Sequence, residues 1–115
     1  MTTINRGMIL VRPREPFIEW LRHLPDPVPD AEVAFATQER TAYLVPEWND
    51  PAGLERVLKR YATKIFEEEL ESWDRVKSGW PKERTLGKFR EWFEIEACSL
   101  VMNLATVPVL EEDLH

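Results

Sequence analysis

The sequence predicts an α+β domain in which a small, mainly antiparallel sheet of three or four strands packs against two or three helices, in the order β-α-β-α-α-β. Two patterns indicate this class: a long segment of helical periodicity in the middle of the chain, and short apolar or β-branched runs that end at prolines. A chain of 115 residues has the length of one domain, so we expect a single compact α+β domain over residues 1–115.

The first strand is predicted at Met8 to Val11, a short continuous apolar run between Gly7 and Pro13. Such a run is typical of a strand that is buried on both faces, so we expect it in the centre of the sheet. Pro16 can begin a short helix, because proline at the first helical position lacks only a donor that the helix does not use. The apolar side of this helix consists of Phe17, Ile18, Trp20, Leu21 and Leu24.

Two further strands are predicted before the centre of the chain. Residues 25–29 contain three prolines and form a stiff extended loop, after which Val33 to Ala36 indicates a short edge strand. Arg40 to Val45 is the better strand, since it contains β-branched and aromatic residues and Pro46 closes it.

The segment from Asp50 to about Arg75 predicts a long helix. Asp50 stands at the N-cap, where its carboxylate can accept backbone N–H bonds, and Pro51 stands at the first helical position. Apolar residues then recur at steps of three and four, which keeps one face of the helix apolar for about six turns. These residues are Leu54, Val57, Leu58, Tyr61, Ala62, Ile65, Phe66, Leu70 and Trp73.

A second helix and a last strand are predicted after the long helix. Thr85 can cap a helix whose apolar residues extend to Phe93. Residues 95–104 fit two structures, an alternating strand or a continuation of that helix with Ala97 and Leu100 on its apolar face. We favour the strand, because a sheet of three or more strands is a more plausible partner for two helices than an isolated pair.

Charge and composition exclude several classes of function. The net charge of −6 argues against general affinity for nucleic acid or an anionic membrane, because both need a local positive excess. No apolar run has the length of a membrane span, and the first residues lack the apolar core of a signal peptide. Cys98 is the one cysteine, so no internal disulfide forms and a reducing cytoplasm is the expected location.

Five tryptophans are a large number for a chain of this length. Trp20, Trp73 and Trp92 lie in or beside apolar helix stripes, where packing in the core is the expected role. Trp48 and Trp80 each stand in a loop beside a helix end. They are candidates for binding a partner, because tryptophan is enriched at binding hot spots, and they fit equally well as lids on the core.

Residues 75–90 form the one basic and aromatic stretch of this acidic chain. Six cations and one anion give a local balance of +6 − 1 = +5, and Trp80 lies among them. The stretch could meet phosphate or an acidic protein surface, or pair with the chain's own carboxylates in residues 67–74 and 91–96. The predicted partner-binding residues are Trp48, Trp80, Arg75, Lys77, Lys82 and Arg84.

No motif predicts catalysis, a metal site or a cofactor. A nucleophilic pair of Cys98 and His23 would need an imidazole beside the thiol, but neither residue lies in a catalytic motif. Cys98 is read more simply as a small buried residue and His23 as a polar helix position. Glu67 and Glu71 share a helix face, yet the histidine-rich or Asp-x-Asp spacing of a metal site is missing, so a solvated face is expected.

Several short motifs together resemble a family of small bacterial cytosolic proteins of unknown function. The motifs are the run Met8 to Val11 followed by Pro16-Phe17-Ile18-Glu19-Trp20, then Tyr43-Leu44-Val45-Pro46-Glu47, Phe66-Glu67-Glu68-Glu69-Leu70, Trp80-Pro81 and Phe89-Arg90-Glu91-Trp92-Phe93. The resemblance covers most of the chain. It implies a compact single domain and a bacterial source, and it supplies no activity, substrate or catalytic residue.

The leading hypothesis is a non-enzymatic protein-interaction module of the bacterial cytoplasm that binds another protein or itself. A specific form is an inhibitor of the immunity or antitoxin type, because a small acidic protein suits a basic target. One alternative is a small-ligand binder or small enzyme with a pocket near Trp20, His23 and Trp92. Another is contact with nucleic acid through residues 75–90, which the overall charge argues against.

Overall fold

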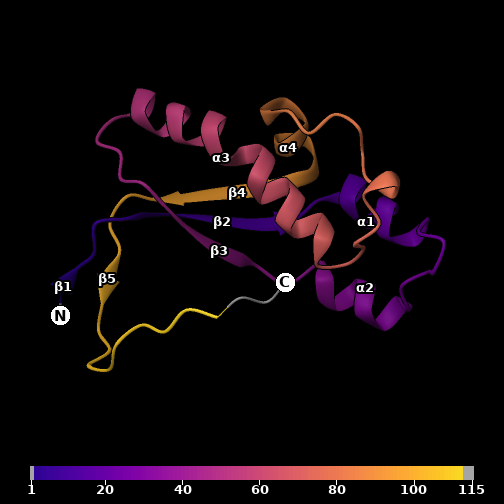
Figure 1. The fold of residues 1–115 in the computed structure, drawn as a ribbon, viewed down its shortest axis with the longest axis horizontal. Helices are drawn as coiled ribbons and strands as arrows, with labels where there is room; N and C mark the ends of the chain where they lie inside the picture. Colours follow the sequence, from indigo (N-terminus) through magenta and orange to yellow (C-terminus); the bar gives the residue numbers. More distant parts are fainter. Residues whose placement is uncertain (1, 113–115) are drawn as a thin grey trace.

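The structure is a computed structural model that describes residues 2–112 and has an α+β fold (Figure 1). The two ends of the predicted domain, residue 1 and residues 113–115, lie outside the described residues. The elements are β1 (Thr2–Thr3), β2 (Gly7–Pro13), α1 (Glu15–Arg22), α2 (Asp30–Ala36), β3 (Thr41–Val45), α3 (Pro51–Glu71), the 3₁₀ turn η1 (Lys77–Gly79), α4 (Leu86–Trp92), β4 (Phe93–Cys98) and β5 (Met102–Asn103).

The main sheet is antiparallel and has the strand order β3-β2-β4, which confirms the central position predicted for Met8 to Val11. β1 and β5 form a separate two-stranded sheet. Figure 1 shows α3 lying across the main sheet, with α1 and α2 near one end of it and the β1–β5 pair beyond the other end.

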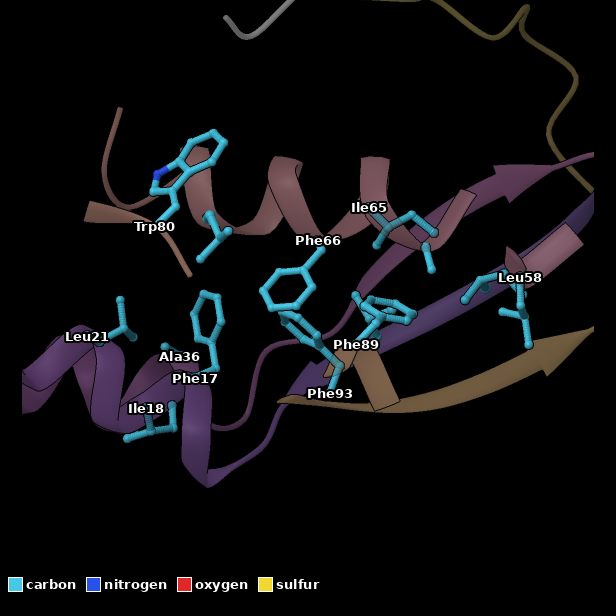
Figure 2. Packing of buried hydrophobic residues seen from close by; sticks show 14 of the residues in the cluster. Phe17, Ile18, Leu21, Ala36, Leu58, Ile65, Phe66, Trp80, Phe89 and Phe93 are labelled. Carbon is cyan, nitrogen blue, oxygen red and sulfur yellow. The ribbon is translucent and has the colours of Figure 1, made fainter. Parts of the chain in front are cut away.

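One face of the main sheet carries the core. Ile9 and Val11 of β2 are buried, whereas Met8 and Leu10, which alternate with them, are only partly buried. The buried residues from the sheet and all four helices form one cluster. Aromatic rings make its centre, with Phe17 of α1, Phe66 of α3 and Phe93 of β4 directed toward one another (Figure 2).

Helix α3 begins as predicted. The Asp50 carboxylate accepts a hydrogen bond from the backbone N–H of Gly53 at 2.6 Å, and Pro51 is the first helical residue. Most of the predicted apolar stripe is buried, including Phe66 and Leu70. The predicted end near Arg75 is wrong, because the helix stops at Glu71. Past that point, a turn closed by the Asp74 N–H and the Leu70 carbonyl leads the chain away.

Replacing Asp50 with alanine is expected to lower the free energy of unfolding by about 0.5–2 kcal/mol, because the first turn of α3 loses its side-chain cap. Urea denaturation followed by circular dichroism measures this loss. Asp50→Asn is the matched control, since its amide oxygen can accept the same N–H, and it should retain most of the wild-type stability. Equal losses in both variants would contradict a role for the cap.

The short edge strand predicted at Val33 to Ala36 is wrong, because these residues belong to helix α2. Pro29 precedes the helix in an extended conformation, and Asp30 and Glu32 lie in its first turn, where negative side chains favour the helix N-terminus. Val33 and Ala36 are three residues apart and both buried. A strand would have placed these two side chains on opposite faces, so the helix is the structure that buries both.

Residues 95–104 are partly strand and nowhere helix. The Thr85 hydroxyl caps α4 by accepting the Lys88 N–H at 3.2 Å, as predicted, but α4 ends at Trp92. Phe93 is already extended, and β4 continues directly from it to Cys98. After three residues outside a strand, β5 follows. The predicted strand is therefore confirmed for residues 95–98 and 102–103 only.

Candidate functional site

Trp80 is buried and packs against the core. A lid on the core is one of the two roles predicted for it. Its side chain is packed in the hydrophobic cluster and the residue is 6% exposed (Figure 2). Its indole N–H donates to the Asp74 carbonyl at 2.8 Å. The cationic groups of Lys77 and Arg84 lie 5.9 Å and 5.7 Å from the centroid of its ring. Two of the predicted partner-binding cations thus stack on the protein's own tryptophan.

Several cations of the basic stretch are engaged within the fold. The Arg84 guanidinium lies 3.3 Å from the Glu67 carboxylate and also donates to the Pro81 carbonyl at 2.7 Å. Arg90 forms an ion pair with Glu55 at 2.8 Å. The remaining predicted partner-binding cations, Arg75 and Lys82, are exposed. The stretch therefore presents less free positive charge than its sequence indicates.

Trp48 lies partly buried beside Gly7. A Cβ atom at Gly7 would lie 2.1 Å from the nearest carbon of the indole ring, so the ring occupies the space that a side chain would need. Trp48 also lines a surface hollow of about 390 Å³ together with Arg56, Arg60 and Tyr61. Trp48 is therefore both a lid over the start of β2 and a wall of that hollow.

The pocket region suggested near Trp20, His23 and Trp92 contains packed aromatic side chains. The ring centroid of Trp92 lies 5.4 Å from that of Phe66 and 6.2 Å from that of Phe17. The ring centroids of Trp20 and Phe17 are 5.3 Å apart. His23 is exposed, and its Nδ1 lies 2.7 Å from the Glu19 carbonyl oxygen.

Cys98 and His23 lie at opposite ends of the main sheet. Cys98 pairs with Met8 near the start of β2, whereas His23 follows α1, which begins after the other end of β2. Met8 and Pro13 are five residue steps apart along the strand, or about 16 Å. Cys98 is also only partly buried, not fully as predicted. The fold does not bring the thiol and the imidazole together.

Within residues 2–112, no group of three or more His, Cys, Asp or Glu residues has the arrangement of a metal site. In the same part of the chain, no helix has the length and apolar character needed to cross a membrane.

Adjoining surface hollows run along α3, two of them also lined by β3, and together we call them the β3 groove. Three hollows of about 480, 280 and 390 Å³ make it up. The first two share Tyr43 and Glu68, and the last two share Tyr61, so they adjoin along the helix. The aromatic residues of the groove are Phe35, Tyr43, Trp48, Tyr61 and Trp73.

A carboxylate and a phenol meet in the largest hollow. The Tyr43 hydroxyl donates to Glu69 Oε2 at 2.5 Å, and the Thr41 side chain also donates to this carboxylate. Burial raises the pKa of Glu69, although both hydrogen bonds oppose the rise. Burial first, and then the Glu69 charge, raises the pKa of Tyr43. The phenol therefore stays protonated at neutral pH and acts as a donor to Glu69.

Glu69→Gln is expected to change how stability depends on pH. Since the pKa of Glu69 is raised above 4.5, the folded state keeps this proton over a range in which the unfolded state has lost it. Its contribution to stability is full below pH 4.5 and is lost as the pH rises through the folded-state pKa. The stability of the wild type relative to Glu69→Gln should therefore fall with rising pH. Urea denaturation of both proteins across this range tests it, and parallel curves would contradict it.

The strand β3, whose Thr41, Tyr43 and Val45 line the hollows, is an edge strand of the main sheet. β3 pairs with β2 alone among the strands of residues 2–112, so its other edge has no neighbouring strand. In an antiparallel strand the backbone N–H and C=O groups of alternate residues point to opposite sides. Along β3, every second residue therefore presents its backbone groups outward.

Sequence reasoning missed Tyr43, Tyr61 and Glu69 as site residues. Glu69 belongs to an acidic run whose side chains are expected to face solvent. It stands four residues after Ile65, however, and therefore lies on the apolar side of α3. That spacing is the signal that could have identified it. Trp73 was assigned to the core, and it packs against the core while also lining the largest hollow.

Comparison with known proteins identifies no relative: the chain matches no family model, no curated protein and no solved structure. The resemblance to a family of small bacterial cytosolic proteins therefore stays a prediction. The β3 groove is the feature of the described residues that best fits a binding role, because it combines aromatic walls, charged ends and an open strand edge.

Proposed function

We propose that this protein is a non-enzymatic interaction module that binds an extended segment of another polypeptide in the β3 groove. The observation that carries the proposal is that β3, which has an unpaired edge, also lines two adjoining hollows that have aromatic side chains in their walls. An extended segment adds to such an edge as a further strand, and its main chain then satisfies the outward N–H and C=O groups.

Side chains of the bound segment would alternate between the groove and the opposite face of the sheet. Those on the groove side meet aromatic residues, which supply contact area at low conformational cost. Trp48 is the predicted partner-binding residue that lines this groove, whereas Trp80 is packed in the core. We therefore propose a recognition surface along β3 and α3 rather than on the basic stretch.

Selection of random seven-residue peptides on the full chain tests this proposal. NMR titration of the labelled protein with a selected peptide should shift the amide signals of Thr41–Val45 and of α3 residues in the groove. Lys64→Glu, which changes a wall of the middle hollow, should alter the affinity. Lys59→Glu is the matched control, because this exposed residue lies on α3 outside the three hollows. Selection of no peptide, or shifts confined to other surfaces, would overturn the proposal.

An inhibitor of the immunity or antitoxin type is a specific form of this module in the bacterial cytoplasm. The net charge of −6 favours association with a basic target. Co-expression with a toxic gene from the same locus should then restore growth. Failure to restore growth would overturn the inhibitor proposal. The peptide-binding proposal would still be tested separately by the peptide selection.

A further inference from the structure

The chain carries an exposed apolar segment of its own, residues 104–112, which we call the C-terminal segment. Leu104, Val107, Val109 and Leu110 are 75%, 69%, 77% and 86% exposed. Figure 1 shows the segment leaving β5 and running separate from the helices and the main sheet. Four large apolar side chains this exposed in one short stretch make the segment a candidate contact surface.

The two ends of the β3 groove differ in charge. Glu39, Glu68 and Glu69 line the hollow beside the start of β3. At the other end, Arg56 and Arg60 line a hollow together with Glu47 and Asp50, and Lys64 and Glu68 both line the hollow between. The hollow at that end balances at +2 − 2 = 0, with its Asp50 carboxylate already bound to the helix N-terminus, whereas the first hollow carries three carboxylates. A bound segment with an acidic end should therefore place that end near Arg56 and Arg60.

The C-terminal segment has such an end, because Glu111 and Glu112 follow its apolar residues. Bound parallel to β3, the segment would direct these carboxylates toward Arg56 and Arg60. In Figure 1 the chain's own segment runs in the direction opposite to β3. If the chain's own segment bound to β3 in this opposite direction, Glu111 and Glu112 would lie at the acidic end of the groove. Repulsion between like charges disfavours that arrangement.

Resting on the function proposed above, we propose that the β3 groove binds the C-terminal segment of a second copy of this chain. Pro108 is compatible with the added strand if Val107 and Val109 form the main-chain bonds to β3, since proline then faces outward at the new edge. The apolar side chains of the segment become buried along the groove and the sheet. Two copies that exchange segments in this way form a closed, symmetric dimer.

The mass of the full chain across a concentration series, measured by light scattering after size exclusion, tests the proposal. Dimer should appear as the concentration rises. Val107→Asp combined with Val109→Asp should abolish it without unfolding the protein, because both side chains are exposed in the single chain. A synthetic peptide of residues 104–112 should compete with dimer formation. A mass equal to one chain at every concentration, or a dimer that both substitutions leave intact, would overturn the proposal.

Charge reversal identifies the orientation. Glu111→Lys with Glu112→Lys should weaken association about fivefold to tenfold, as expected for the loss of two exposed ion pairs. Adding Arg56→Glu and Arg60→Glu should restore it, whereas Glu83→Lys, in the loop before α4, should have no effect. Weakening by Glu83→Lys of the same size would overturn the orientation argument and with it the choice of a second copy.

The two proposals fail separately. If selected peptides bind along β3 while the 104–112 peptide does not bind, the groove keeps its proposed function and the second copy is rejected. If neither the selected peptides nor the 104–112 peptide perturbs β3 and α3, both proposals are overturned. If the chain's own segment binds the groove, the NMR shifts of the β3 amide signals will not depend on protein concentration. That result also rejects the second copy.

Discussion

Replacing Phe66 with alanine is expected to lower the free energy of unfolding by about 3–5 kcal/mol. Phe66 is fully buried at the centre of the aromatic cluster (Figure 2). Its ring centroid lies 5.3 Å from that of Phe93 and 5.4 Å from that of Trp92. The substitution removes the buried ring and leaves a cavity between α3, α4 and β4. Such a loss is a large part of the roughly 5–15 kcal/mol that stabilises an ordinary domain.

Urea denaturation followed by circular dichroism measures the effect. Phe35→Ala is the matched control, since this phenylalanine lies on α2 and is 62% exposed. Its loss should cost less than about 1 kcal/mol, because little apolar area returns to water and alanine favours the helix. Similar losses for Phe66→Ala and Phe35→Ala would contradict the position of the core.

Replacing Gly7 with alanine is expected to lower the free energy of unfolding by about 1–3 kcal/mol. The added Cβ would lie 2.1 Å from the Trp48 ring, so the indole must leave its position over the start of β2. In a Trp48→Ala background, the same substitution should cost much less, because the obstructing ring is absent. The interaction energy from this double-mutant cycle measures the contact directly.

Gly87→Ala is the control for a glycine without such a neighbour. A Cβ there would have its nearest contact at 3.9 Å, and the position is in the first turn of α4. Alanine should therefore be neutral or stabilise the protein by up to about 1 kcal/mol. A cost at Gly7 that persists unchanged without Trp48 would mean that the ring does not occupy the space beside Gly7.

The elements that sequence reasoning identified correctly have strong local signals. Asp50 and Pro51 specify a helix start through backbone groups in the same turn, and the structure confirms both positions. The central strand depends on a continuous apolar run, and its central position is confirmed. The predicted burial of both faces is wrong, because Ile9 and Val11 are buried whereas Met8 and Leu10 are only partly buried. At Val33 to Ala36 the predicted edge strand was wrong, and the helix formed because it buries Val33 and Ala36 together.

The tryptophans show the limit of such reasoning. Trp80 stands in a loop, and its sequence neighbours do not distinguish a surface anchor from a lid. Its burial follows from packing against the core and from the hydrogen bond to the Asp74 carbonyl. Whether a loop side chain turns inward depends on the space left between elements, which no local pattern encodes.

The sequence by itself determined the α+β class, the long helix from Pro51 and the central strand, because periodicity and capping act between residues that are close in the chain. The β3 groove was decided by tertiary structure. It forms where side chains of the edge strand β3 and of α3 line the same hollows, and its half-buried Glu69 carboxylate accepts a hydrogen bond from a tyrosine 26 residues away. Contacts between distant segments form only when the elements pack, so the candidate site becomes visible only in the folded chain.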